Sequence, residues 1–435
     1  MREMLSAYLF GDSSGIYDAF ITAWRVPNLF RRFLGEGALS TSLQTALTEV
    51  DGDQGLDAGR RLFQETLWLV TWVLFAICAL VMVLVTLVPA EMPWTGWAWL
   101  GEDPAEVREL TVRVMPFCLL ICLSAAVGGA LQVRGHFGSP AWAPAIFNVA
   151  WIGTLLAIGS YFGFQTDLEG EALAAHHFEM TKSLAWGVLG AGVIQLFVQV
   201  PALLRTGLIG RVRQGAASGV QKALSMKRSA GSVLKTSAPL ALGAAVYQVN
   251  VMVDGLMAES LLPPGGPTLH YYANRLQQFP LALIAIAATS AVFPSLKALG
   301  HRGQLKELRS LHDSTQLAIS FVALPASLGL FLLAQPIVQV SLEHGAFGAE
   351  GVRRTSDALR ALSLAILPAG ATGLVARTYY ALGDFRTPVQ VSIVALTLNV
   401  ALNVVFIVGF GFDVSGLAWA TAITSWGGLF GLLVL

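Results

Sequence analysis

The sequence predicts an all-α polytopic membrane protein, built as two parallel-repeat six-helix lobes around a central cationic cavity. Three observations support this prediction: a small charged fraction, a series of long apolar segments and a motif that occurs twice. Of the 435 residues, 55% are hydrophobic and only 12% are charged, whereas soluble domains carry about 25% charged residues. The composition therefore excludes a disordered chain, a nucleic-acid binder with a basic face and most soluble enzymes.

The apolar segments are long enough to cross a bilayer, which takes about 20 mostly apolar residues in a helix. Residues 1–10 resemble the end of one further segment. Eleven full spans are expected near residues 15–48, 63–89, 110–133, 141–163, 183–205, 232–262, 270–297, 313–340, 355–382, 388–411 and 414–435.

The basic residues gather on one side of the predicted membrane. If the spans alternate, the loops near 205–235 and 297–309 fall on the same side, and both are rich in Lys and Arg. The loops near 91–106 and 167–179, on the other side, are acidic or mixed. Cytoplasmic loops carry the excess of Lys and Arg, so the basic side is predicted to be cytoplasmic.

A repeated motif indicates two related halves. Residues 135–140 and 383–388 share the pattern G-x-F-x-[S/T]-P at an offset of 248. Both copies fall on the cytoplasmic side, which predicts a parallel repeat, although chance similarity between two helical corners is an alternative. We expect an N-terminal lobe over 1–206 with an incomplete first helix, a basic cytoplasmic linker over 207–231, and a C-terminal lobe over 232–435. Paired bundles of this kind are typical of transporters.

Several charges occur in or beside apolar segments, where each costs at least about 2.5–3.5 kcal/mol at the bilayer centre. They are predicted to face a water-filled cavity or to pair with one another. The arginine fork suits phosphate, so the candidate ligand is a phosphate or pyrophosphate. The alternative is snorkelling to lipid phosphates, which is strongest for Arg31 and Arg32. The candidate anion-binding residues are Arg2, Arg25, Arg31, Arg32 and Arg275, and the candidate acidic partners or gate residues are Asp18 and Glu36.

Polar residues in the C-terminal half form a second candidate site. Asp254 is the lone acid of its span, Asn399 and Asn403 share a helix face, and Thr421 lies in the next span. Carboxylate, amide and hydroxyl oxygens suit a small hard cation such as sodium. A hydrogen-bonded cluster between helices is the alternative. No enzyme motif occurs, so an enzyme is not expected.

The N-terminal residues 18–40 resemble the signature of the MurJ/MviN family, in the pattern D-A-F, R-V-P-N-L-F-R-R and G-E-G-A-L-S. Residues 271–280, 343–347 and 379–388 resemble later motifs of the same family. The similarity covers essentially the whole chain. It implies a lipid II flippase of the MOP superfamily, related to MATE transporters, which works in peptidoglycan synthesis at the bacterial cytoplasmic (inner) membrane.

The resemblance also implies roles for individual residues. Arg2, Arg31 and Arg275 match the family's cavity arginines, and Asp18 matches its acidic residue in the second helix. The four polar residues around Asp254 resemble a sodium site of some members. The family carries a longer first helix and two further C-terminal helices, so the chain is expected to lack both ends.

The resemblance implies lipid II and membrane lipids as partners, with cell-wall synthesis proteins as an open option. No nucleic acid and no cofactor are expected beyond sodium as a candidate coupling ion, and the monomer is expected to be functional. Two alternatives remain. One is another flippase or a multidrug exporter of the superfamily, and the other is a membrane scaffold for cell-wall synthesis.

Overall fold

The computed structural model describes residues 1–30, 39–87, 104–164, 168–209, 249–283 and 287–434, and within these ranges the secondary structure is helical without a strand. Residues 249–261 are also helical. The labelled helices are α1 (Arg2–Phe10), α2 (Gly15–Phe30), α3 (Leu39–Gln54), α4 (Leu56–Leu87), α5 (Pro104–Val114), α6 (Phe117–Val133), α7 (Gly138–Phe162), α8 (Gly170–Phe197), α9 (Val200–Arg205), α12 (Gly266–Leu281), α13 (Ala287–His301), α14 (Leu305–Leu332), α15 (Ala334–Leu342), α16 (Ala349–Ser363), α17 (Ile366–Ala381), α18 (Arg386–Val404), the π-helical turn η5 (Val405–Gly409) and α19 (Val414–Val434).

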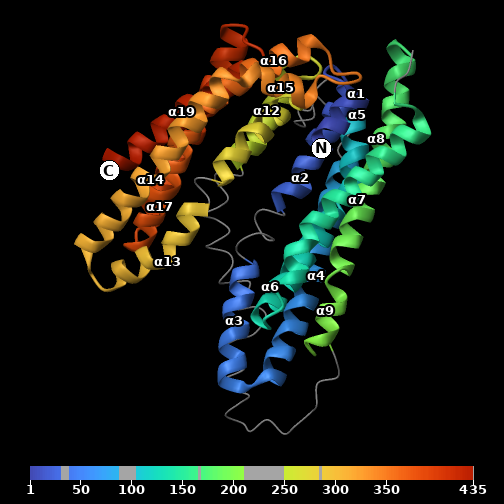
Figure 1. Ribbon diagram of the computed structural model, residues 1–435. Coiled ribbons are helices and arrows are strands. Elements are labelled where there is room, and N and C mark those ends of the chain that lie inside the picture. Colours follow the sequence, from blue (N-terminus) through green and yellow to red (C-terminus); the bar gives the residue numbers. More distant parts are fainter. Residues whose placement is uncertain (31–38, 88–103, 165–167, 210–248, 284–286, 435) are drawn as a thin grey trace. The chain divides into compact units, whose positions relative to one another are not determined.

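The chain forms two compact units. Among the described residues, the first unit contains 1–5, 22–30, 39–87, 104–164 and 168–209, and the second contains 6–21, 249–283 and 287–434. In Figure 1 the first unit runs mainly from blue to green and the second from yellow to red. The corner between α1 and α2 therefore packs with the C-terminal half of the chain. The predicted linker over 207–231 lies almost entirely outside the described residues, so the predicted lobe boundaries stay a prediction.

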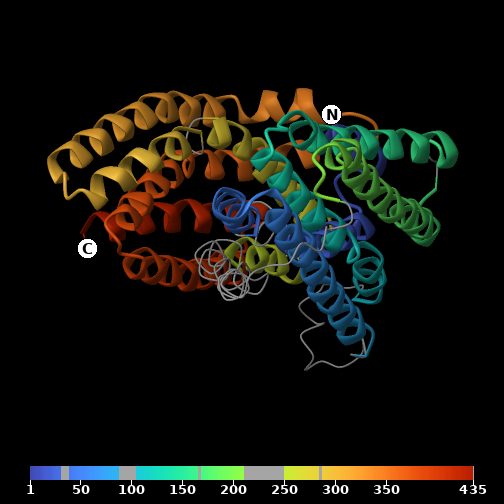
Figure 2. The ribbon, with the colours of Figure 1, turned by 90° about the horizontal axis from the view of Figure 1, so that it is seen from below.

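The two units repeat the same helix order. Helix α7 begins at residue 138, and its counterpart α18 begins 248 residues later, at 386. The packing repeats as well: α3, α4 and α8 contact α6, and α13, α14 and α19 contact α17 in the same way. In both views the helices of the second unit run alongside one another (Figures 1 and 2). The structure therefore repeats the same helix order and packing in both units, and the parallel orientation of the repeat stays a prediction.

Each unit has a central helix that several neighbouring helices contact. Eleven of the 17 residues of α6 are buried, and α17 contributes Leu374 to one core cluster and Ala371 and Val375 to another. The first of these clusters joins α17 to Leu296 of α13 and Ile319 of α14, and the second joins it to α19. Small residues on α6 and α17 let the neighbouring helices approach closely, as in other membrane bundles.

The outer surface is apolar, as expected for helices that face lipid. Phe321 and Leu332 on α14 and Leu87 on α4 are more than two-thirds exposed. Eight helical stretches in the described part of the chain are long and apolar enough to cross a membrane. Eleven were predicted, and the three others, near 15–48, 232–262 and 270–297, each include residues outside the described ranges.

The repeated motif forms the same turn twice. Gly135 and Gly383 adopt positive φ angles of 77° and 85° directly after α6 and α17. In each copy the next residue donates its backbone N–H to a carbonyl five residues earlier, so both turns close a helix in the left-handed glycine manner. The second copy adds Asp384, whose carboxylate accepts hydrogen bonds from the hydroxyl and N–H of Thr387 and from the N–H of Arg386. These bonds lower the pKa of Asp384.

Replacing Gly383 with alanine should destabilise the protein by about 1–2 kcal/mol, because an L-residue pays that cost in the left-handed region. A Cβ at this position meets no atom within 4 Å, so the effect isolates the backbone. The matched control is Gly373→Ala within α17, where a Cβ also meets nothing and helix propensity favours alanine. Thermal unfolding in detergent measures both. Equal melting temperatures for the two variants would contradict the turn assignment.

Candidate functional site

Arg2 is held inside the first unit by three different contacts. Its Nη2 lies 2.6 Å from Glu3 Oε1, and its Nη1 donates to Asn148 Oδ1 of α7 at 3.3 Å. Its guanidinium carbon lies 4.5 Å from the centroid of the Trp151 ring, also on α7. The side chain is 11% exposed. The guanidinium is thus largely enclosed by protein, and the predicted role of Arg2 in anion binding stays a prediction.

Arg275 has a similar environment in the second unit. It lies on α12, where its Nε donates to the hydroxyl of Tyr271 at 3.1 Å and its guanidinium carbon lies 5.3 Å from the Tyr271 ring centroid. Each of these two arginines is therefore paired with an aromatic ring. Arg2 and Arg275 belong to different units, so their convergence on one cavity stays a prediction.

Asp18 aside, the structure describes only one of the four other residues predicted to bind anions or form a gate. Arg25 lies on α2 and is partly buried. Arg31, Arg32 and Glu36 lie outside the described residues. Their predicted roles in anion binding and gating stay predictions.

The carboxylate of Asp18 accepts hydrogen bonds from backbone N–H groups at the start of α12. Its side chain is 2% exposed, and its two carboxylate oxygens accept hydrogen bonds from the backbone N–H of Gly265 at 2.5 Å and of Thr268 at 2.9 Å. Both donors are at the N-terminus of α12, where unsatisfied N–H groups and the helix dipole favour a negative charge. Position 265 accepts only glycine, because a Cβ there would lie 1.8 Å from the carbonyl oxygen of Asp12. The proposed pairing of Asp18 with an arginine stays a prediction.

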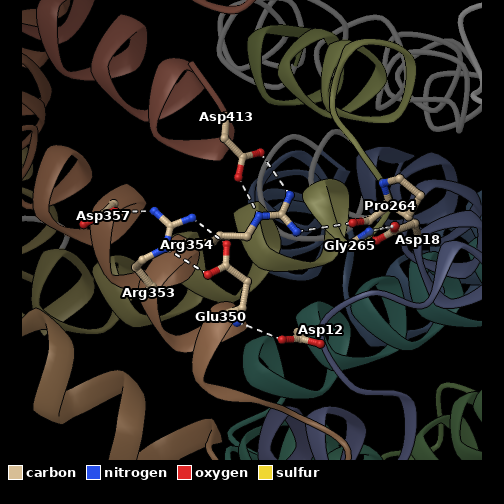
Figure 3. Close-up of polar contacts among 10 residues, drawn as sticks. Asp12, Asp18, Pro264, Gly265, Glu350, Arg353, Arg354, Asp357 and Asp413 are labelled. Carbon is tan, nitrogen blue, oxygen red and sulfur yellow. Dashed lines mark hydrogen bonds and ion pairs between the residues drawn. The ribbon is translucent and has the colours of Figure 1, made fainter. Parts of the chain in front are cut away.

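Asp18 is part of a larger polar network that the sequence did not reveal (Figure 3). Arg354 of α16 makes a bidentate ion pair with Asp413, with Nε to Oδ2 at 2.5 Å and Nη2 to Oδ1 at 3.0 Å. Its Nη1 also donates to the carbonyl of Pro264 at 3.3 Å. Asp12 accepts the N–H of Gly351 at the start of α16 at 2.8 Å. The network thus joins the α1–α2 corner, the starts of α12 and α16, and the loop before α19.

Sequence patterns missed this network for a physical reason. Asp12, Arg354 and Asp413 lie at segment ends, where a charge is normally solvated and carries no signal. Only the recurrence of acids near helix starts hinted at it, and that pattern is common. If the spans alternate as predicted, the network lies on the side opposite the basic loops.

The structure brings together all four residues of the candidate cation site. Asn403 Nδ2 donates to Asp254 Oδ1 at 2.8 Å and to Asn399 Oδ1 at 3.2 Å. Thr421 Oγ1 donates to Asp254 Oδ2 at 3.5 Å. Thr424, which the sequence did not single out, accepts from Asn399 Nδ2 at 3.4 Å. Residues 249–261, α18 and α19 therefore present four polar side chains to one another in an apolar interior.

One atom in this cluster bears on cation binding. The buried Oδ1 of Asn403 has no hydrogen-bond partner among the described residues, although its own Nδ2 serves several acceptors. An unpaired buried oxygen costs about 1–3 kcal/mol. Rotating this amide by half a turn would direct its oxygen toward Asp254, which a cation between the two oxygens or a proton on Asp254 would favour. The donor set consists of oxygens and therefore fits a hard monovalent cation.

Comparisons with known proteins agree along the whole chain. A model of the family described as "Lipid II flippase MurJ" matches residues 6–435. A probable lipid II flippase MurJ of Vibrio cholerae is 28% identical, over 98% of this chain and 77% of the relative. The lipid II flippase MurJ of Burkholderia cenocepacia is also 28% identical, over 93% of this chain and 74% of the relative.

Solved structures show the same fold. A lipid II flippase MurJ in an inward closed conformation matches with a TM-score of 0.75 and 21% identity, over all of this chain and 83% of that one. An inward-facing multidrug resistance MATE transporter of the MOP superfamily matches with a TM-score of 0.71 and 13% identity, over 99% of this chain and 91% of that one. The predicted MOP/MATE-like fold is confirmed.

Replacing Asp18 with asparagine should lower stability by about 2 kcal/mol, because hydrogen bonds to a charged group contribute about 1.5–3 kcal/mol. The amide keeps one acceptor and turns a donor toward a backbone N–H. The control is Asp313→Asn on α14, whose side chain is 63% exposed. Thermal unfolding of both variants in detergent checks this. An Asp18 variant that melts with the wild type would show that the contact to α12 contributes nothing.

Proposed function

Because the chain belongs to the family of lipid II flippase MurJ, we propose that it carries lipid II across the bacterial cytoplasmic membrane. It is a multi-pass membrane transporter and not an enzyme. The cargo is the undecaprenyl-pyrophosphate-linked disaccharide-pentapeptide used in peptidoglycan synthesis, moved from the cytoplasmic to the periplasmic leaflet. The chain covers about three quarters of the curated relatives it matches.

Two arginines that lie against aromatic rings carry this proposal. Arg2 and Arg275 lie on helices of an apolar protein, and each has an aromatic ring beside its guanidinium. Burying a charge is costly, and in membrane helices such charges mark substrate paths. The pyrophosphate of lipid II is an anion that the arginine fork fits, because two parallel N–H groups match two phosphate oxygens. A carrier for cationic drugs would need acids in these positions, which argues against the drug-exporter alternative.

The repeat supports an alternating-access mechanism. Two units with the same helix order, each with its own packed central helix, can move as bodies while a ligand is exchanged between the two sides. In this mechanism Arg2 and Arg275 bind the pyrophosphate, and the polyprenyl chain remains in lipid. The two charged phosphates of the cargo cost more free energy to move through the bilayer than its neutral groups. The arginines would therefore bind the part of the cargo that is hardest to move across.

Sodium is the proposed coupling ion, because the cluster around Asp254 fits it. The oxygens available to it are those of Asp254, Asn399, Asn403 and Thr421. Binding there would pull residues 249–261 toward α18 and α19, and would thereby couple ion occupancy to the packing of the second unit. The hydrogen-bonded cluster without an ion is the alternative that the experiments below separate.

Replacing Arg275 with alanine should abolish lipid II translocation in proteoliposomes, whereas Arg275→Lys should retain part of it, because a single ammonium keeps the charge but loses the fork. Loss of one charge-assisted contact of about 1.5–3 kcal/mol corresponds to a roughly 10- to 150-fold weaker interaction. The control is Arg309→Ala, whose side chain is 85% exposed. Wild-type translocation by the Arg275→Ala variant would refute the assignment, and a scaffold role would predict that result.

Sodium should raise the melting temperature of the wild-type protein relative to choline at equal ionic strength, because a ligand that binds only the folded state stabilises it. Asp254→Asn should remove that increase, and Thr424→Val should keep it, because Thr424 contacts Asn399 and not Asp254 in the described network. An increase that survives in Asp254→Asn would place the ion elsewhere. No increase in the wild type would favour the hydrogen-bonded cluster.

A further inference from the structure

The position of Arg2 is set by α7 and not by its own helix. Its neighbour Glu3 is adjacent in sequence and moves with it, so this ion pair cannot fix where the guanidinium lies. In the described part of the chain, Arg2 also contacts Trp151 and Asn148, which lie one turn apart on α7 and can hold the guanidinium in place. Trp151 therefore connects a candidate cargo-binding charge to the body of the first unit.

The Trp151 ring is itself immobilised by other rings. Trp24 of α2 packs edge-on against it at 4.9 Å between ring centroids, and Phe147 does so at 5.5 Å. Phe117 of α6 packs against both Trp24 and Phe147, at 4.8 and 5.2 Å. Trp151 is 3% exposed. Four aromatic side chains from three helices thus build a rigid platform under one guanidinium.

This arrangement suits an arginine that must exchange partners. A free arginine side chain carries about 2 kcal/mol of rotamer entropy, and an ordered one has already lost part of it before a ligand arrives. A tryptophan face attracts the guanidinium through its quadrupole and contributes no negative charge that would repel an anion. Glu3, in contrast, is an anionic partner that a phosphate can replace.

We infer that Trp151 is a positioning residue: it holds the Arg2 guanidinium in place while a phosphate oxygen of the cargo takes the position of the Glu3 carboxylate. The inference rests on the proposed function, since it assumes that Arg2 binds the cargo. Glu3 satisfies the charge of Arg2 when no cargo is present, and Asn148 keeps one N–H group oriented in both states. The aromatic platform remains unchanged throughout the exchange.

The test is the dependence of translocation on lipid II concentration in proteoliposomes. Trp151→Leu removes the ring and should raise the half-saturating concentration about 2- to 30-fold, the range expected for a cation–π contact. Trp151→Phe retains a ring with a weaker quadrupole. Its half-saturating concentration should therefore lie between those of the wild type and Trp151→Leu. In an Arg2→Ala background, the Trp151 substitutions should cause no further change, because the partner they position is gone.

Two controls separate positioning from folding. Trp142→Leu removes an exposed tryptophan from the same helix and should leave the concentration dependence unchanged. Phe147 packs against Phe117 and Trp151, and its described ring contacts do not include Arg2. Phe147→Leu should therefore lower the melting temperature and have only a small effect on the half-saturating lipid II concentration. Where Trp151→Leu fails to fold, Trp151→Phe supplies the comparison.

Each outcome has a defined meaning. If wild-type protein does not translocate lipid II, the proposed function is wrong. If it does, and Trp151→Phe and Trp151→Leu keep the wild-type half-saturation, or their effects add fully to that of Arg2→Ala, the positioning role is wrong. Graded effects that vanish in the Arg2→Ala background support it.

Discussion

The hydrocarbon interior of the membrane is the constraint on which the rest of this structure depends. It offers no water to a backbone N–H, a carboxylate or a guanidinium, so each must find a partner within the protein. With 12% charged residues, the chain keeps few such groups. Those it keeps inside are surrounded by specific partners: two aromatic rings beside the arginines, two backbone N–H groups for Asp18, and amide and hydroxyl groups for Asp254.

These partners divide the buried charges into two kinds. Asp12 and Asp18 accept backbone N–H groups at helix starts, and Arg354 donates to the carbonyl of Pro264 before α12; these contacts are internal to the second unit. They organise the corner between α1 and α2 and the starts of α12 and α16. Arg2 and Arg275 rest on aromatic rings instead. A ring holds a cation without adding a negative charge that would repel an anion.

The sequence predicted the parts of the structure that depend on periodic or repeated signals. The apolar runs predicted the helices, and the motif near residues 135 and 383 predicted a repeat whose offset of 248 recurs in the starts of α7 and α18. Asp254, Asn399, Asn403 and Thr421 were grouped correctly because a polar residue in an apolar span stands out.

The contacts that depend on chain ends and on tertiary packing were not predictable. Nothing in the pattern around Asp413 distinguishes an ion-paired carboxylate from a solvated one. The packing of residues 6–21 with the second unit also depends on tertiary contacts that no periodic pattern encodes. Trp151 was indistinguishable from any other apolar residue of its span, because its role depends on a cation from a helix more than 100 residues away.

The central claim is that arginines inside the protein bind the phosphates of the cargo. The most direct measurement compares binding of undecaprenyl pyrophosphate and uncharged undecaprenol to the purified protein by native mass spectrometry, in the wild type and in an Arg2→Gln, Arg275→Gln double variant. We expect the wild type to prefer the pyrophosphate and the double variant to bind both lipids equally. An undiminished preference for the pyrophosphate in the double variant would contradict this claim.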